Sequence, residues 1–511
     1  MKKNILQKIG VQTFLIGTIL FTGCQKELDI NHNPSVSTVD QATPALLFPA
    51  AVLATTAKVG GDLGIVGGMW SQFCTQAALA QQYTDIDSYN LTNTDAFVSG
   101  INSSWTILYT NGLKNYQAVI DESKATGNWN FYLMGTVMKA YTWEVLADLY
   151  DEVPYTEALE GTANLQPKFD SGIVVYQGLL QEIDTALSKD FTASTNTAPG
   201  NADLVFGGNI NSWFQFANTL RLKFYLRMIN AYPALAQSGI TTLYNSNPSF
   251  LSSDASVTNF TNASGLDNPM FEQNFRSLNT PTNLRASATL VSWLTVNKDS
   301  RILALFDSSS STLAGIFPST SPNPGSVNQG DFRNSSNPVY QTAPIFGESP
   351  TDPVEFISLA ESYFMQAEAD LRYFGGNNAQ ALYNQGVLAA FGYYGQDGSA
   401  YIAPGGVYAF PAGGSLEDKI AAIITQKWIS CAYGCHGIES FFEKNRTGYP
   451  LTSPVYSTSP AYVPGQLVIS LNTVLGPGML PKRFVYPYDE RSKNPNTPTE
   501  VSITTPVWWA Q

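Results

Sequence analysis

Residues 133–159 read LMGTVMKAYTWEVLADLYDEVPYTEAL, and this stretch decides the fold class. Apolar side chains return at every fourth position, which places them together on one face of a helix. They are Leu133, Val137, Tyr141, Val145 and Leu149. Pro154 lies just beyond the last of them and ends the helix, because proline lacks the backbone N–H that a helix interior needs. The pattern therefore predicts a long amphipathic helix over 131–150.

The helical period returns further along the chain. Apolar residues recur every three or four positions over 213–228 and over 353–373. Two glycines end the second of these segments, and another helix is expected over 378–391. A further helix follows Ser415, because Ser415-Leu416-Glu417-Asp418 has the spacing of a capping box. Paired helices of this length predict a mainly α protein built from tetratricopeptide-like hairpins, although no clean 34-residue consensus repeats.

The composition changes between about residues 236 and 350. Ser, Asn, Thr, Pro and Gly dominate there, and periodic apolar runs are few. We expect a loop-rich insertion with loops at 308–311 and 318–328, and with room for a short hairpin. Loops mounted on a helical scaffold usually carry binding function. No long linker divides the chain, so residues 43–511 are expected to form one domain with this insertion facing a ligand or partner.

Charge and composition exclude several kinds of partner. The 511 residues include 27 Lys and Arg against 40 Asp and Glu, which gives a net charge of −13. That charge repels phosphate backbones and anionic membrane surfaces, so no nucleic-acid partner is expected. Only 13% of the residues are charged, whereas 12% are aromatic. A surface rich in aromatic, amide and hydroxyl groups suits neutral, hydroxyl-rich ligands such as sugars.

The first residues have the pattern of an export signal. A basic start precedes an apolar run over 9–21, which is too short to span a bilayer but suits a cleavable signal peptide. Small residues then lead into Cys24. We therefore expect a cleaved lipoprotein signal peptide over 1–23, a Cys24 that carries acyl chains such as palmitate, and a tether over 24–42. The alternative is an ordinary thiol at Cys24 after a plain secretory signal.

Five segments, in order along the chain, carry a family signature. They are 133–159, quoted above, 213–228 (WFQFANTLRLKFYLRM), 355–372 (EFISLAESYFMQAEADLR), 423–450 (IITQKWISCAYGCHGIESFFEKNRTGYP) and 480–495 (LPKRFVYPYDERSKNP). Together with Asn31–Pro34 and the export signal, they resemble the successive blocks of SusD/RagB-like outer-membrane lipoproteins. The resemblance extends over nearly the whole mature chain.

The resemblance implies a helical protein with tetratricopeptide-like hairpins, anchored in the outer membrane by its lipid and facing the cell exterior. Such proteins act as a lid over a SusC-like TonB-dependent transporter, bind glycans or in some cases peptides, and perform no chemistry. The shared blocks are mainly architectural, and several of their residues are expected to fix C-terminal turns. These are Arg446, Pro450, Arg483, Tyr486 and Pro487. The family marks no ligand residue that can be transferred to this chain.

Ligand contacts are instead expected from aromatic and amide side chains in two loop-rich segments. The first set is Trp70, Gln82, Tyr83, Tyr89 and Trp105. The second set is Asn268, Phe271 and Phe275, chosen by location and composition alone. A large aromatic side chain among turn residues lacks an obvious core stripe and is therefore a candidate platform for a sugar. For Trp70 the alternative is an ordinary helix core, since it follows two glycines.

The segment Cys431-Ala-Tyr-Gly-Cys435-His436 resembles a haem-attachment or metal motif with one residue too many between the cysteines. A packing role is favoured, because the chain has only two histidines to complete a zinc site. A local disulfide between the two cysteines stays open as an alternative. No metal and no cofactor are expected.

Two further groups of residues have a structural and a functional interpretation. Asp148, Asp151 and Glu152 follow a helix, and a carboxylate pair could hydrolyse a glycoside, but capping of the turn is favoured. Trp508-Trp509 near the end could stack on a sugar, but docking of the chain terminus is favoured.

The sequence therefore predicts a non-catalytic surface lipoprotein that captures a nutrient, most simply an oligosaccharide, and passes it to a TonB-dependent transporter. Peptide capture is the alternative within the binding class. A surface glycoside hydrolase and a purely structural subunit of the transporter complex are the alternatives from other classes.

Overall fold

A computed structural model of the protein describes residues 42–76, 82–91, 96–277, 284–305 and 349–510. The expected signal peptide, Cys24 and Asn31–Pro34 lie outside these residues, as do the expected loops at 308–311 and 318–328. From Pro44 onward the described residues form one contact unit.

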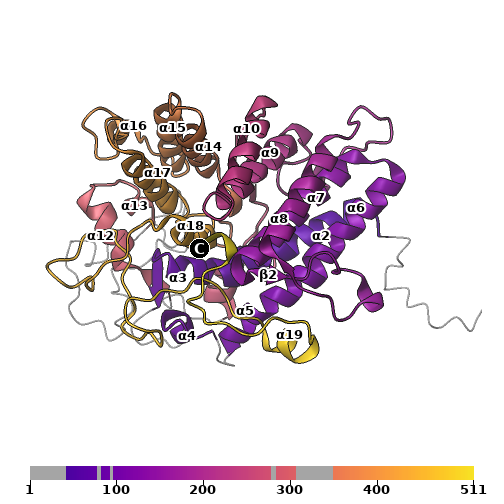
Figure 1. Cartoon of the computed structure of the whole chain (residues 1–511), viewed down its shortest axis with the longest axis horizontal. Helices are drawn as coiled ribbons and strands as arrows, with labels where there is room; N and C mark the ends of the chain where they lie inside the picture. Colours follow the sequence, from indigo (N-terminus) through magenta and orange to yellow (C-terminus); the bar gives the residue numbers. More distant parts are fainter. Residues whose placement is uncertain (1–41, 77–81, 92–95, 278–283, 306–348, 511) are drawn as a thin grey trace, which may run out of the picture. The chain divides into compact units, whose positions relative to one another are not determined.

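Helices dominate the N-terminal half (Figure 1). The helix predicted over 131–150 is α7 (Trp129–Tyr150), and the one predicted over 213–228 is α9 (Ile210–Arg227). The other elements here are α2 (Pro44–Ala57), η2 (Lys58–Asp62), α3 (Leu63–Trp70), α4 (Thr84–Asp87), α5 (Ala96–Ile107), η3 (Leu108–Leu113), α6 (Lys114–Thr126), η4 (Gly161–Ala163), α8 (Gly172–Leu187), η5 (Gly200–Ala202) and α10 (Pro233–Asn245).

The continuous stretch Pro44–Trp70 is long and apolar enough to cross a membrane, but 56% of its most apolar window is buried inside the fold. It is therefore accounted for as a core helix.

The C-terminal half adds a second group of helices. The predicted segments become α14 (Leu359–Tyr373), α15 (Ala379–Gly392) and α17 (Leu416–Ser430). The capping box at Ser415 is confirmed, since its hydroxyl accepts from the Asp418 N–H while the Asp418 carboxylate accepts from the Ser415 N–H. The remaining elements are α16 (Ser399–Ile402), α18 (Gly437–Thr447), α19 (Tyr488–Lys493) and η9 (Trp508–Ala510).

Successive helices pair as hairpins, in agreement with the predicted architecture. In Figure 1, α6 lies beside α7, and α14 lies beside α15, and both pairs make extensive contacts. Close approach explains the small residues at these crossings: a Cβ on Gly386 of α15 would meet the Phe364 ring of α14. The protein is thus mainly α with tetratricopeptide-like hairpins.

The structure corrects two boundaries. The prediction of a helix from residue 353 is wrong at its start, because β6 (Val354–Ile357) precedes α14 and pairs with β4 (Ala255–Val257). The expected insertion at 236–350 also contains more order than its composition indicates. It holds the end of α10, α11 (Pro269–Phe271), η6 (Glu272–Ser277), α12 (Ala288–Val296) and α13 (Ile302–Leu305).

Two other short antiparallel pairs complete the described sheets. β1 (Cys74–Gln76) pairs with β5 (Leu284–Ala286), so that Cys74 lies opposite Ala286. β2 (Glu152–Val153) pairs with β3 (Asp170–Ser171). The first pair joins the segment after α3 to the insertion.

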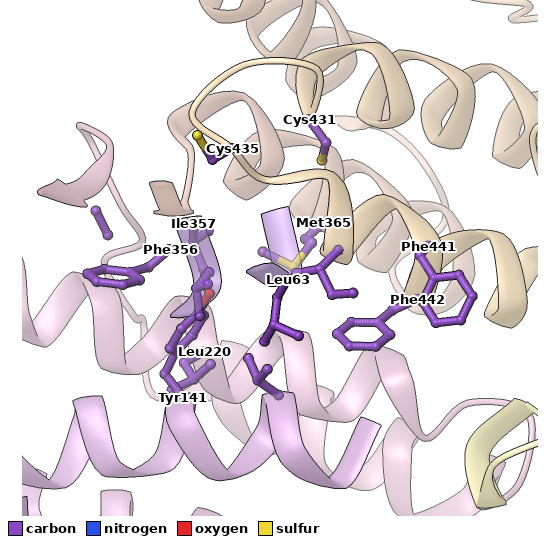
Figure 2. Close-up of a cluster of buried hydrophobic side chains, with 14 of the residues drawn as sticks. Leu63, Tyr141, Leu220, Phe356, Ile357, Met365, Cys431, Cys435, Phe441 and Phe442 are labelled. Atoms are coloured by element: carbon purple, nitrogen blue, oxygen red, sulfur yellow. The ribbon is translucent and has the colours of Figure 1, made fainter. Parts of the chain in front are cut away.

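Apolar side chains from many elements meet in one core, part of which Figure 2 shows. Leu63 of α3, Tyr141 of α7 and Leu220 of α9 are buried there with Phe356 of β6 and Met365 of α14. Periodicity places two of these residues, Tyr141 and Leu220, on the core-facing side of their helices, and the structure buries both.

A buried charge network lies beside this core and joins α7, α9, α14, α17 and α18. Its carboxylates are Glu144, Asp148, Glu361, Glu368, Glu439 and Glu443, and its cations are Lys223, Arg227, Arg372, Lys427 and Arg446. Arg227 alone contacts four of the carboxylates, at 2.6–3.5 Å. Charged groups out of water are stable only when paired in this way.

Candidate functional site

The structure brings the two predicted ligand segments together. The pairing of β1 with β5 aligns the chain after α3 with the insertion. Close by, the Tyr83 hydroxyl donates to Asn274 Oδ1 at 3.2 Å, which links the start of α4 to η6. We call the surface formed by α4 and η6 the α4–η6 face. Here the segment that holds Gln82 and Tyr83 contacts the segment that holds Asn268, Phe271 and Phe275.

Most of the predicted aromatic residues lie beneath this face or away from it. Tyr83 is fully buried, and burial raises the pKa of its hydroxyl far above the ordinary value. Trp105 is buried on α5 and packs edge-on against Tyr150, with ring centroids 4.8 Å apart. These rings support the fold in this structure, and their direct contact with a ligand stays a prediction.

Asn268 has a local structural role. Its side-chain oxygen accepts from the N–H groups of Met270 at 2.9 Å and Phe271 at 3.1 Å, which caps α11. Its amide nitrogen donates to the Asp352 carbonyl at 2.9 Å. A buried amide with all these partners holds the start of α11 and thereby fixes the position of η6.

Phe275 is the predicted aromatic residue that is most available on the α4–η6 face. It is half-buried, and its ring stacks on the buried Phe271 ring with centroids 4.7 Å apart and planes 10° apart. The Arg276 guanidinium lies 5.3 Å from the centre of the Phe271 ring and is paired with Asp267. The stack holds Phe275 in place, so a sugar ring would meet a rigid aromatic surface.

Gln82 supplies an exposed amide at the start of α4. The neighbouring Tyr83 N–H donates to Gln76 Oε1 at 2.5 Å, which ties the residue before α4 to the last residue of β1. Gln82 is thus an exposed hydrogen-bonding group and Phe275 a half-buried stacking group, the two kinds of group that sugar recognition combines.

Trp70 and Tyr89 line a separate cavity of about 170 Å³. Phe441 of α18 forms another wall, with its ring centroid 5.0 Å from that of Trp70. Lys444 and Lys482 bring two cations to the same cavity. The sequence prediction included the two aromatic residues and missed the lysines, which lie more than 350 residues away in family blocks that are expected to be architectural.

A second hollow was missed entirely. A groove of about 390 Å³ runs between α12, α15 and α17 and is lined by Trp293, Tyr408 and Gln426. The two aromatic rings stack on each other, with centroids 5.1 Å apart. The buried Gln426 Oε1 has no hydrogen-bond partner among the described residues. In the sequence, the groove is marked by Trp293, a single tryptophan in the insertion, and the residues around it follow no pattern that would indicate a binding site.

The cysteine motif is structural. Cys431 and Cys435 are both free and buried, which answers the open question of a local disulfide. The Cys435 thiol contacts the Asn268 side chain, and burial raises the pKa of that thiol to about 12. Among the described residues, no group of three or more His, Cys, Asp or Glu is arranged to hold a metal ion.

The acidic cluster and the terminal tryptophans prove to be one structural unit. Asp148 accepts from the Trp509 indole N–H at 2.7 Å and from the Tyr176 hydroxyl at 2.6 Å. Asp151 accepts from the Trp508 backbone N–H at 2.7 Å. Trp508 and Trp509 are therefore docked onto the end of α7, as predicted for them, whereas Asp148 and Asp151 bond this docked segment and not the turn that they were expected to cap.

The expected C-terminal architecture is also present. The Arg483 guanidinium bonds the Tyr150 carbonyl and lies 3.2 Å from Asp151 Oδ2. The Tyr486 hydroxyl donates to the carbonyls of Tyr150 and Glu152 at 3.2 and 3.1 Å. These bonds fasten the segment after residue 480 to the C-terminal end of α7.

Comparison with known proteins gives one consistent result. Residues 40–470 match the SusD-like family model described as "starch-binding associating with outer membrane". No curated protein matches the chain.

Among solved structures, a chitin-binding SusD homologue from Flavobacterium johnsoniae aligns with a TM-score of 0.69 and 21% identity, covering 91% of this chain and 98% of that one. A structure titled "chitin-binding protein" aligns with a TM-score of 0.66 and 22% identity, covering 92% and 100%. A SusD homologue from Bacteroides uniformis gives 0.65 and 22%, covering 91% and 99%. At such identities these structures share the fold.

Proposed function

The chain belongs to the SusD-like family, and from that premise we propose that it is a non-catalytic surface lipoprotein that binds an oligosaccharide and delivers it to a SusC-like TonB-dependent transporter. The match of the family model over residues 40–470 carries this proposal. The family description names starch, and two of the similar structures are titled chitin-binding. Oligomers of glucose and of N-acetylglucosamine are therefore the first ligands to test.

We propose the α4–η6 face as the glycan site. Phe275 would stack on a sugar ring, and the Gln82 amide would bond to the hydroxyl groups at the edge of that ring. The other predicted residues would act from below: Tyr83, Asn268 and Phe271 hold α4 and η6 in place through the contacts described above. The available aromatic surface is small, so we expect binding in the micromolar to millimolar range.

Cys24 is proposed to carry the lipid that anchors the protein in the outer membrane, facing outward. The apolar run before it and the small residues beside it support this assignment. Two or more acyl chains would hold the protein stably at the membrane, since a single chain gives only marginal binding.

Peptide capture is the second candidate within the binding class. It would use main-chain hydrogen bonds and carboxylates more than stacked rings. Asp267 and Glu272 lie beside the α4–η6 face, but both are engaged with Arg276, which favours the glycan over a basic peptide. Hydrolysis is disfavoured for a similar reason: Asp148 and Asp151 bond the docked chain terminus.

Calorimetry of the purified protein against maltooligosaccharides, chitooligosaccharides and a mixture of peptides tests the proposal. We expect saturable glycan binding, and we expect Phe275→Ala to weaken it up to about tenfold, because one stacked ring contributes about 0.5–1.5 kcal/mol. Gln82→Ala should give a smaller loss of affinity. Chromatography of the same samples should detect no shortened glycan.

Val407→Trp is the matched control for location. Val407 is exposed at the Trp293 groove, so a tryptophan there should fill the groove and leave the α4–η6 face unchanged. If Val407→Trp abolishes glycan binding and Phe275→Ala does not, the site is the groove. Peptide binding without glycan binding would favour the second candidate, and new glycan products would overturn the non-catalytic assignment.

A further inference from the structure

The cavity lined by Trp70 and Tyr89 contains a cation that the fold does not neutralise. The Lys444 ammonium donates to the backbone carbonyls of Gly448, at 2.7 Å, and Pro450, so it closes the end of α18. Within the described residues the Lys482 ammonium makes no hydrogen bond or ion pair, although its backbone N–H is bonded to the Ile503 carbonyl at 2.8 Å. A half-buried ammonium without an acceptor is unfavourable, and an anion in the cavity would relieve the cost.

The acidic groups around the cavity are already engaged. Among the described residues no carboxylate lines it. Asp87 of α4 accepts from Ser470 Oγ at 3.2 Å and Asn472 Nδ2 at 3.0 Å. Glu443 of α18 is paired with Arg446 and Arg227, each at 2.6 Å.

No neighbouring carboxylate therefore offsets the cost of holding a charge on the two lysines, and their pKa values fall. Burial, with a further contribution from Lys482, lowers the pKa of Lys444 to about 7. Burial also lowers the pKa of Lys482. A bound anion would favour the charged form of both groups.

The walls of the cavity select the rest of the ligand. The Trp70 indole N–H already donates to the Ile86 carbonyl at 3.1 Å, so its ring offers apolar surface. Phe441 and Leu480 add further apolar surface. At about 170 Å³ the cavity resembles in size an engineered cavity of about 150 Å³ that holds benzene. A ligand built on a single six-membered ring suits a cavity of this size.

We propose that this cavity binds a small carboxylate no larger than one sugar ring, such as a hexuronate, with the carboxylate on the Lys482 ammonium and the ring against Trp70. This site is separate from the proposed glycan face, and it does not depend on that proposal. The protein would thus recognise an acidic monosaccharide or a similar organic acid as well as its oligosaccharide.

Calorimetry with glucuronate and with glucose, the uncharged counterpart, tests the inference on the full-length protein. We expect glucuronate to bind and glucose not to bind. Lys482→Gln should weaken glucuronate binding at least tenfold, because the contact is with a charged group. Lys482→Arg should retain binding, since the charge remains. Lys124→Gln removes an equal charge from the exposed end of α6 and should have no effect.

Three results would overturn the inference: no glucuronate binding, equal binding of glucose, or unchanged binding in Lys482→Gln. Circular dichroism of each variant would exclude loss of fold as the cause. The experiments distinguish failure of this inference from failure of the proposed glycan site. Phe275→Ala should leave glucuronate binding intact, and Lys482→Gln should leave oligosaccharide binding intact.

Discussion

Arg446 shows how a single side chain holds distant elements together. Its guanidinium forms a two-pronged pair with Glu368 of α14, at 2.8 and 2.7 Å, and a second pair with Glu443 of its own helix, at 2.9 and 2.6 Å. The neighbouring arginines lower the pKa of both carboxylates. Burial alone would raise the pKa of Glu368, but the charge of Arg446 outweighs burial and lowers that pKa to about 2. The planar fork of arginine is what allows four bonds at once.

Arg446→Lys should therefore destabilise the protein although the charge is kept. An ammonium cannot bond two carboxylates with the same geometry, so we expect a loss of about 2 kcal/mol, measured as a lower urea midpoint at unchanged slope. Arg372→Lys is the control, because Arg372 bonds the same Glu368 through one nitrogen at 2.8 Å and is partly exposed. Its loss should stay below about 1 kcal/mol. Equal losses in the two variants would mean that the fork is unimportant.

At the scale of elements, the crossing of α3 and α18 depends on the absence of side chains. A Cβ on Gly67 would overlap the backbone of Gly437 and Ile438, and a Cβ on Gly437 would overlap the backbone of Gly67 and Gly68. The two helices thus touch backbone to backbone, beside the cavity that Trp70 and Phe441 share. Gly67 and Gly68, which precede Trp70 in the sequence, lie at this crossing. They are the residues that favour a core position for Trp70.

Gly67→Ala should force the two helices apart and cost about 3 kcal/mol, the upper range for added volume in a packed interior. Thermal unfolding measures the loss, and glucuronate binding should fall as well because Trp70 and Phe441 separate. Gly392→Ala on α15 is the matched control, since nothing lies within 4 Å of the added methyl group. That variant should be within about 1 kcal/mol of the wild type, on the stable side. A mild effect at Gly67 would show that the crossing can relax.

The helical elements could be predicted because each long helix carries its own period. Leu133 to Leu149 face the core whatever else the chain does, and the capping box at Ser415 is complete within four residues. β6 was missed because Val354–Ile357 (VEFI) has only four residues, too few for the spacing of its apolar side chains to distinguish a strand from a helix, and its partner β4 lies about 100 residues earlier. Local pattern cannot report such pairing.

The candidate site was harder to predict than the fold, for the same reason. The sequence around an aromatic residue in a turn looks the same whether the side chain is exposed or buried. Phe275 is partly exposed and Tyr83 is fully buried, and their surroundings in the sequence do not distinguish them. The cavity at Trp70 needs Lys482, which joins it only through the tertiary fold. Sequence reasoning therefore found the segments that meet and could not tell which side chains reach the surface.

For the whole molecule, the buried charge network couples stability to pH. Within the described residues it contains six carboxylates and five permanently cationic side chains, with His436 bonded to Glu361 at 2.9 Å. Carboxylates exceed the permanent cations, so one site in the network favours a proton. Burial, opposed by Lys223 and reinforced by the nearby Asp148 carboxylate, raises the pKa of Glu144 to about 8. Burial likewise raises the pKa of Asp148 to about 6, against the effect of Arg227.

The direction of the pH effect follows from proton binding in the two states. Between pH 4.5, the ordinary pKa of a glutamate, and about 8, the folded protein keeps a proton on Glu144 that the unfolded chain has lost. The free energy of unfolding therefore falls as the pH rises through this window, by up to about 1.4 kcal/mol per pH unit for one proton. Glu368 acts oppositely, since its lowered pKa stabilises the fold above pH 4.5 and that stability is lost as the pH falls towards 2.

Glu144→Gln removes the titrating proton and keeps the shape of the side chain. The free energy of unfolding of the wild type should fall between pH 6 and 8, whereas that of the variant should fall much less. The difference between the two, measured by urea unfolding at pH 6, 7 and 8, should therefore shift in favour of the variant as the pH rises. Glu122→Gln, on the exposed face of α6, removes an equal charge and should leave the decline unchanged. Parallel pH profiles for the wild type and Glu144→Gln would place the retained proton elsewhere in the network, with Asp148 the next carboxylate to replace. If the stability of Glu144→Gln depends less on pH than that of the wild type, then Glu144 is the carboxylate that stays protonated at neutral pH. Lys223 is then paired with the charged Glu439, and Arg227 with Asp148 and Glu439.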